Sequence, residues 1–131
     1  MSQENVEIVR AAFEAWNAGR MDAVKELYDP DATSQPPKGW PESEPAVGRE
    51  AVLRGFEQLR ETWDADSFEL VSDFTDAGDR VAVRYNWHGV GHGPELNMAF
   101  TCVCTVCKGK IFRVEFFWDH AEALETLGLA E

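Results

Sequence analysis

The second half of the chain is dominated by segments in which apolar side chains recur at every second position. The clearest of them reads GKIFRVEFFWDH and spans residues 109–120. Its alternating apolar set comprises Phe112, Val114, Phe116 and Trp118. Because successive side chains of a strand point to opposite faces of a sheet, this period predicts a buried β-strand with one wholly apolar face. The segment ends on an ionisable pair, Asp119 and His120, directly before a helix-like stretch, AEALETLGL.

Three earlier segments, SFELVSDFTDAG, RVAVRYNWHGVG and ELNMAFTCVCTVCK, carry strand patterns and are separated by turn residues. The first half of the chain shows helical spacing instead. Residues 4–18 and 21–30 predict two helices, the second with Tyr28 facing inward, and a third carries an apolar stripe from Val52 to Trp63. Helices followed by a meander of strands predict an α+β domain, with the helices over one face of the sheet.

The length of 131 residues suits one domain, residues 1–131. The stretch 31–48 is rich in proline and is the one long irregular segment that the sequence predicts, although its first few residues could form a short strand. Loops of this length inside compact domains tend to be lids or binding loops. Trp40 lies within it, so this ring either pins the loop to the body of the domain or covers a ligand.

The charge balance limits the partners that we expect. With 12 basic and 24 acidic residues the formal charge is −12, so the chain should repel nucleic acid and anionic membranes. No apolar run approaches the roughly 20 residues that span a bilayer. The first ten residues, MSQENVEIVR, do not resemble a signal peptide. These features predict a cytoplasmic protein.

Three cysteines cluster in TCVCTVC as Cys102, Cys104 and Cys107. They could form a metal or redox site, since thiolates are good zinc ligands. Alternatively, a strand uses them as small apolar residues, with Cys102 and Cys104 on one face and Cys107 on the other. No further CxxC pair completes a set of four ligands, so the second interpretation is favoured, and we expect neither a metal nor a structural disulfide.

Four phrases, in their order along the chain, resemble a known family: ENVEIVRAAFEAWNAGRMDAVKELYDPDA, GREAVLRGFEQLRETW, GDRVAVRYNWHGVGHG and GKIFRVEFFWDHAEALETLGL. The order resembles the SnoaL-like polyketide cyclase group of the nuclear-transport-factor-2-like superfamily. The resemblance implies a cone-shaped, curved, mixed or antiparallel sheet wrapped around the N-terminal helices, an internal pocket, and a homodimer through the outer sheet face. Its members include cyclases, isomerases, hydrolases, dehydratases and binding or assembly proteins, so the fold alone names no activity.

The sequence departs from the enzyme members of that family in two places. The segment after Asp31 is unusually polar and proline-rich. The tyrosine and protonated aspartate that serve the isomerases as oxyanion donors have no clear match here. Trp16 lies near the position where the first helix would offer such a tyrosine.

Asp119 is the first candidate catalytic residue. At the rim of an apolar cavity its carboxylate would be poorly solvated and therefore a stronger base. It could then remove a proton from a carbon next to a carbonyl, or activate a water. The resemblance supports this placing, because cyclase-like members use an acidic residue at an inner strand position. The alternative is that Asp119 caps the final helix, and the two roles are compatible.

His88 is the second candidate, as a base, proton shuttle or hydrogen-bond donor. A structural role is the alternative for a lone histidine in a strand. If His88 lay near Asp119, the two could act as a base and the residue that orients it. A metal site formed by His88, His92 and a carboxylate is conceivable but disfavoured.

The remaining candidates would bind substrate. Arg84 could hold a carboxylate or enolate oxygen, although an ion pair with Glu115 within the sheet is the favoured interpretation. The aromatic residues could line the pocket, and we select Trp16, Tyr28, Trp40 and Phe117. The chain has no nucleophile elbow, phosphate loop or dinucleotide fingerprint, so we expect no cofactor.

Together these features predict a pocket for a mostly apolar small molecule that bears a carbonyl or hydroxyl group. The predicted chemistry is cofactor-independent proton transfer or water addition: isomerisation, aldol-type cyclisation or hydrolysis. Asp119 would be the base, His88 its partner, and Arg84 or Tyr28 the contact to the oxygen. The rival prediction is a non-catalytic binding or assembly module.

Overall fold

The computed structural model describes residues 2–40, 44–63, 65–91 and 93–128. The helices are α1 (Ser2–Asn17), α2 (Met21–Glu26), α3 (Arg49–Thr62) and α4 (His120–Thr126). The strands are β1 (Tyr28–Gln35), β2 (Ala46–Val47), β3 (Ala65–Leu70), β4 (Thr75–Ala77), β5 (Arg80–Val90), β6 (Leu96–Cys107) and β7 (Lys110–Phe117). No helix among the described residues is both long enough and apolar enough to cross a membrane.

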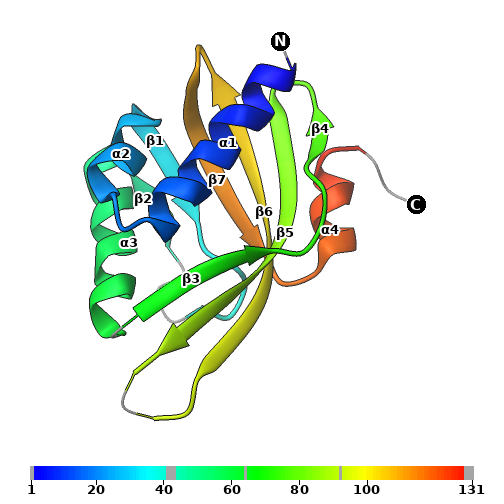
Figure 1. Ribbon diagram of the computed structural model, residues 1–131. Helices are drawn as coiled ribbons and strands as arrows, with labels where there is room; N and C mark the ends of the chain where they lie inside the picture. Colours follow the sequence, from blue (N-terminus) through cyan, green and yellow to red (C-terminus); the bar gives the residue numbers. More distant parts are fainter. Residues whose placement is uncertain (1, 41–43, 64, 92, 129–131) are drawn as a thin grey trace.

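The strands form one curved, mixed sheet in the order β2-β1-β7-β6-β5-β3, with β4 paired to β5 (Figure 1). The pairing of β1 with β7 is parallel, and the other pairings are antiparallel. Helices α1, α2 and α3 lie on one side of the sheet, whereas α4 lies behind it (Figure 1). The predicted α+β fold with a curved sheet around N-terminal helices is confirmed.

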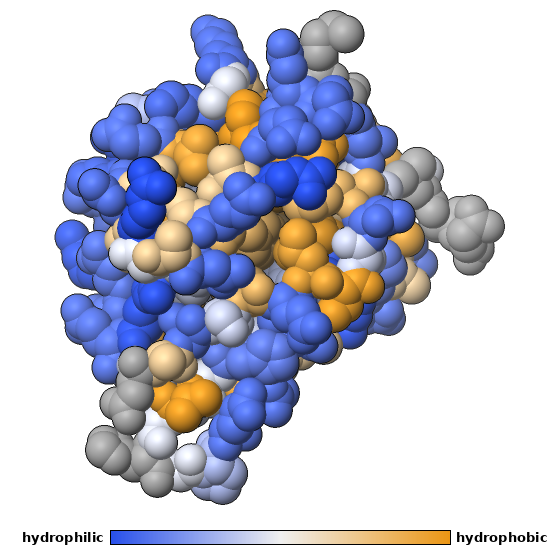
Figure 2. Space-filling model, in the orientation of Figure 1, coloured by the Kyte–Doolittle hydropathy of each residue, from blue (hydrophilic) through white to orange (hydrophobic). Residues whose placement is uncertain are grey.

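The apolar residues divide into two clusters that match these layers. The larger cluster lies between the sheet and α1–α3 and includes Val9, Tyr85 and Trp87, all nearly fully buried. The smaller one lies under α4 and includes Ala82, Val103 and Ala123. In Figure 2 most of the visible face is hydrophilic, and hydrophobic residues gather in patches toward its middle.

Helix α1 is tied to the edge of the sheet by an asparagine. The side-chain amide of Asn17 donates to the carbonyl oxygen of Phe68 at 3.0 Å, and its carbonyl oxygen accepts from the Phe68 amide at 2.8 Å. This pair of bonds satisfies backbone groups of edge strand β3 and fixes the end of α1 beside it.

One expectation for the first half of the chain is wrong: Tyr28 does not belong to the second helix, which ends at Glu26, and begins β1 instead. The short strand considered for the first residues of the stretch 31–48 is confirmed as the end of β1, whereas β2 was not predicted. The register of β1 against β7 shifts between Tyr28 and Thr33, which accommodates Pro30 within the strand.

The predicted apolar face of the last strand is interrupted by a β-bulge. Ile111 pairs with Val106 and Arg113 with Thr105, which leaves Phe112 as the extra residue on β7. Phe112 is therefore turned outward and 41% exposed. Val114 and Phe116 line the cavity. Trp118 lies beyond the end of the strand and is 40% exposed, but its ring stacks on Phe100 of the inner face, so Phe112 is the member of the alternating set that turns outward.

Candidate functional site

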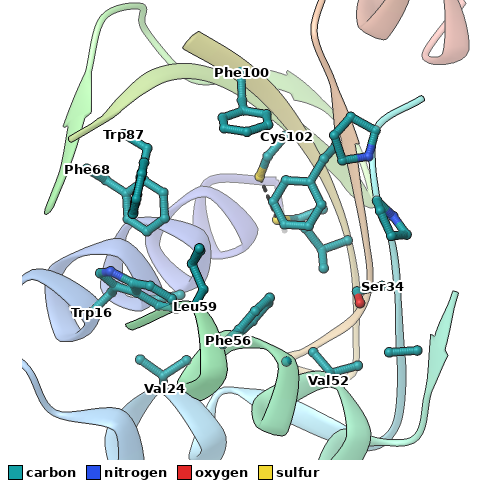
Figure 3. A pocket seen from close by; sticks show the side chains of 18 of the residues that line it. Trp16, Val24, Ser34, Val52, Phe56, Leu59, Phe68, Trp87, Phe100 and Cys102 are labelled. Carbon is teal, nitrogen blue, oxygen red and sulfur yellow. Dashed lines mark hydrogen bonds between the residues drawn. The ribbon is translucent and has the colours of Figure 1, made fainter. Parts of the chain in front are cut away.

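A cavity of about 480 Å³ lies between the inner face of the sheet and helices α1–α3. This volume falls within the roughly 300–1,000 Å³ of small-molecule sites. Its walls are mainly aromatic and aliphatic, and Figure 3 shows Trp16, Phe56, Phe68, Trp87 and Phe100 arranged around the open space. Helices supply Trp16 and Phe56, and strands supply the other three.

Two tyrosines provide hydroxyl groups in this apolar wall. Tyr28, at the start of β1, and Tyr85, on β5, are 5% and 1% exposed and both line the cavity. Neither phenol oxygen has a hydrogen-bond partner within the described residues, and neither is among the side-chain polar atoms sealed from solvent without a partner. Both hydroxyl groups therefore reach the open space of the cavity.

Burial raises the pKa of both tyrosines well above the ordinary value of 10.0. The nearby thiols of Cys102 and Cys104 add to the rise in each case. Tyr28 and Tyr85 are therefore neutral around pH 7, and each has an O–H to donate.

Cys102 and Cys104 lie on the same inner face of β6, with their sulfur atoms 3.5 Å apart. Both thiols are free and 2% exposed, and Cys107 is free and exposed. The hydrogen bond with Cys104, followed by burial, raises the pKa of the Cys102 thiol. The structure thus confirms the predicted placing of the three residues. Among the described residues no group of three metal-binding side chains comes together.

The cavity wall is supported from behind by a buried carboxylate that sequence analysis missed. Asp66, on β3, has a side chain that is 2% exposed. Its Oδ2 accepts from Nε1 of Trp16 at 3.2 Å and from Nε1 of Trp87 at 3.1 Å. Its Oδ1 lies 3.3 Å from Nη2 of Arg60, whose guanidinium also stacks over the Trp16 ring. One carboxylate therefore orients two indole rings of the wall.

Three of the predicted substrate-binding residues line the cavity: Trp16, Tyr28 and Trp40. Trp40 approaches from the proline-rich segment, and its ring centroid is 6.2 Å from those of both Phe100 and Trp118. The indole Nε1 of Trp118 donates to the carbonyl oxygen of Lys38 at 2.7 Å. Both functions considered for Trp40 therefore have a structural basis: it pins the segment to the domain, and it forms part of the cavity wall.

Asp119 does not line the cavity. It is exposed and is the N-cap of α4, where its Oδ1 accepts from the amide of Ala121 at 2.9 Å. The capping alternative is confirmed, and the predicted opening of this carboxylate into the cavity is wrong. The helix that follows provides unpaired N–H groups, which bind the carboxylate at the surface.

His88 lies on the outer face of β5 and does not line the cavity either. Its Nδ1 is hydrogen-bonded to Asn97 and lies 3.4 Å from Glu95, while its Nε2 is 3.1 Å from Glu69. The bond to Asn97, and then the bond to Glu69, raises the pKa of His88. The structure shows no contact between His88 and Asp119, so the predicted pair of base and orienting residue is not brought together.

Arg84 and Phe117 also face outward. Nη1 of Arg84 donates to Oγ1 of Thr101 at 3.0 Å and to the carbonyl oxygen of Trp118 at 3.1 Å. Glu115 pairs with Arg113 at 3.2 Å, so the favoured ion pair between Arg84 and Glu115 is wrong. Phe117 packs in the cluster under α4 rather than in the cavity. Arg84 and Phe117 were predicted to bind substrate, but both occupy outward positions of their strands. Inward and outward positions alternate along a strand, so their neighbours Tyr85 and Phe116 are the residues that face the cavity.

The described residues that line the cavity include no arginine, lysine or histidine. Their one carboxylate is Glu44, an exposed residue between the proline-rich loop and β2. The arrangement can therefore surround an apolar molecule and donate hydrogen bonds from two neutral phenols.

The fold and the cavity define a class: a small α+β protein with a curved sheet closed by helices over an apolar pocket. The family model for the SnoaL-like domain matches residues 9–114. The chain therefore belongs to the SnoaL-like domain family of the nuclear-transport-factor-2-like fold. No curated protein matches it.

Solved structures agree on the fold at low identity. Bal32a, from a soil-derived mobile gene cassette, is 22% identical with a TM-score of 0.80 over 88% of each chain. TerC, co-crystallised with polyporic acid, is 18% identical with a TM-score of 0.77, over 95% of this chain and 98% of TerC. A candidate polyketide cyclase from Xanthomonas campestris pv. campestris is 22% identical with a TM-score of 0.73, over 96% of this chain and 98% of its own.

Proposed function

We propose that this protein binds a mostly apolar small molecule bearing a carbonyl or hydroxyl oxygen in the cavity between sheet and helices. The observation that carries the proposal is the pair of buried phenols, Tyr28 and Tyr85, which reach an apolar space without a protein partner. A ligand that covers these hydroxyls without accepting a hydrogen bond from them would leave a buried polar group unpaired, at a cost of about 1–3 kcal/mol. A ligand oxygen that accepts from the hydroxyls would avoid that cost, and the aromatic walls would bury the rest of the ligand.

One structural neighbour supports a small-molecule ligand for a protein of this fold. TerC was crystallised with the small molecule polyporic acid. It shares only 18% identity with this chain. It therefore supports the use of the fold as a small-molecule site rather than the identity of the ligand.

Turnover by proton transfer is the candidate chemistry of this site. Two neutral O–H donors on a carbonyl oxygen would stabilise the negative charge that develops when a neighbouring carbon loses its proton. Isomerisation and aldol-type cyclisation both proceed through such an intermediate and need no cofactor. Glu44, the carboxylate of the described lining, is the group that would accept the proton.

Binding without turnover is the second candidate. The observation that favours it is the exposure of Glu44, because a solvated carboxylate is a weak base at neutral pH. Incubation with a bound ketone in D₂O separates the two candidates. Exchange of the protons next to the carbonyl, abolished by Glu44→Gln, supports proton transfer, whereas binding without exchange supports a binding protein.

A cavity-filling substitution tests the proposed site itself. Gly55, on α3, lines the cavity, and a Cβ at this position would meet no atom within 4 Å. Gly55→Leu should fill the space and abolish the thermal stabilisation produced by a ligand. Gly55→Ala gains the same helix propensity with little added volume and should retain it. If both variants bind a ligand equally well, the ligand does not occupy this cavity.

We also propose a homodimer through the outer face of β5–β7, on the part that α4 leaves uncovered. The resemblance to the family suggests it, and Arg84, His88 and Asn97 place donors and acceptors on that face. Sedimentation equilibrium would test the proposal. A monomer at about 100 μM would contradict it, since stable dimers of this interface class bind more tightly.

A further inference from the structure

We infer that the ligand of this cavity is uncharged around pH 7 and is recognised through an acceptor oxygen by Tyr28 and Tyr85. This inference rests on the proposed function and narrows its ligand class. It excludes carboxylates, phosphates and sulfates of the same shape. The carrying observation is the composition of the wall. Its described polar residues are two phenols, two thiols, the uncharged Ser34, Gln58 and Thr62, and the carboxylate of Glu44, and none of its side chains is basic.

The arginines close to the cavity are engaged elsewhere. Arg60 lies behind Trp16 and is committed to Asp66 and to the Trp16 carbonyl oxygen, at 3.3 and 2.6 Å. The guanidinium of Arg49 donates to the backbone oxygen of Tyr28 at 3.3 Å, and its Nε is sealed from solvent without a partner. Neither residue is part of the cavity wall. An anion in the cavity would therefore lose its hydration without gaining a cation.

The donors of the wall suit a neutral acceptor. Burial keeps Tyr28 and Tyr85 protonated, so they donate to an oxygen without adding charge. The one charged group of the described lining is the carboxylate of Glu44, and the net charge of the chain is −12. Both repel an approaching anion, and the second effect weakens with added salt.

Three naphthalenes of nearly equal shape separate the effect of an acceptor oxygen on the affinity from the effect of a negative charge. The probes are 2-acetylnaphthalene, with a neutral acceptor; 2-naphthoate, with an anionic one; and 2-isopropylnaphthalene, with none. Equilibrium dialysis at pH 7.5 gives the three dissociation constants. We expect the ketone to bind at least about tenfold more tightly than either of the others, since one good hydrogen bond and one uncompensated charge each amount to about that factor or more.

The double variant Tyr28→Phe/Tyr85→Phe connects the preference for the ketone to the phenols. In this variant the ketone should bind no more tightly than the hydrocarbon, while the affinity for the hydrocarbon stays within about twofold. Naphthoate binding as tightly as the ketone, or no preference of the wild type for the ketone over the hydrocarbon, would overturn the inference. The first outcome leaves the proposed function standing, whereas the second also removes the oxygen contact from it and leaves only a site for an apolar molecule. By contrast, ketone binding that persists in Gly55→Leu would overturn the proposed function as well.

Discussion

The two faces of strands β5, β6 and β7 differ in what neighbouring residues of the same strand contact. On the inner face, Tyr85, Phe100 and Phe116 line the cavity. On the outer face their chain neighbours Arg84, Thr101 and Phe117 bond or pack near α4. Neighbouring residues of one strand therefore lie in different environments: one faces the candidate ligand site, and the next lies on the outer surface or packs near α4.

The difference between the two faces explains why the ionisable strand residues that were predicted to be catalytic do not lie in the cavity. A charge on the inner face would be buried in an apolar space unless it were paired. The strands accordingly carry Arg84, His88 and Glu115 on the outer face. The strand residues that face the cavity supply only uncharged polar groups, which are hydroxyls and thiols. Asp66 is buried on the inner side of β3, and it is bonded to an arginine and two indoles.

The largest expected difference between the cavity wall and the protein surface is in the reactivity of their cysteine thiols. Cys102 and Cys104 are buried in the cavity wall, whereas Cys107 is exposed at the end of β6. A bulky disulfide reagent should modify Cys107 at least about 100-fold faster, because the buried thiols react only after local opening. Quenched samples analysed by mass spectrometry measure the three rates. In urea the three should converge; two fast cysteines in the folded protein would break the comparison.

Loss of the buried carboxylate should have the largest effect on stability. Asp66→Asn removes the ion pair with Arg60, whose side chain is 23% exposed, and weakens the bonds to two indoles. We expect the free energy of unfolding in urea to fall by about 2–4 kcal/mol. The matched control is Glu69→Gln on the opposite face of the same strand, where the side chain is 63% exposed. Its effect should stay below about 1 kcal/mol, and equal losses would contradict the assignment.

Removal of a phenol hydroxyl should change the free energy of unfolding much less than loss of the Asp66 carboxylate. Tyr85→Phe deletes a buried hydroxyl that has no partner among the described residues. Without ligand, the free energy of unfolding should change by less than about 1 kcal/mol, because the substitution breaks no hydrogen bond within the described part of the protein. Chemical denaturation of Tyr85→Phe and Tyr28→Phe measures the change. A loss above about 1 kcal/mol would reveal an intramolecular bond and remove the basis for ligand recognition.

The smallest expected effect on stability is the pH-dependent contribution of His88 on the outer face. Glu69 and Glu95 face it together with Asn97, and the bonds raise its pKa above 6.5. Its stabilising contribution is therefore fully present below about pH 6.5 and is lost as the pH rises through the raised folded pKa. An NMR titration of the imidazole should show this pKa, and Glu69→Gln should lower it. Glu122→Gln, on α4, is the control and should leave it unchanged.

Much of the fold followed from local pattern, and the exceptions depend on distant contacts. The helices and the strands β5, β6 and β7 have clear periodicity. Strand β1 reads YDPDATSQ, with a proline and little alternation, and it exists because it pairs with β7 in parallel. The bulge at Phe112 likewise depends on the register with β6, which no local signal in the sequence specifies.

The site was predicted in part, and the missing residues had usable signals. Trp16, Tyr28 and Trp40 were found as large aromatic residues at informative positions. Tyr85 was not among the predicted ligand-binding residues, because sequence does not distinguish a filled core from a hollow one. Asp66 was missed because the strand was expected to begin at Ser67. A start two residues earlier would have placed it on the face of Phe68.

Trp118 links two parts of the molecule that belong to different layers. Its ring is stacked on Phe100 with centroids 4.6 Å apart, its N–H holds the loop at Lys38, and Lys38 in turn lies 3.7 Å from Glu122 on α4. The segment that carries Trp40 and the C-terminal helix are therefore both linked to the cavity wall through Trp118 and Lys38. A substitution of Glu122 on α4 consequently removes a contact of the segment that supplies Trp40 to the wall, although Glu122 itself lies outside the cavity lining.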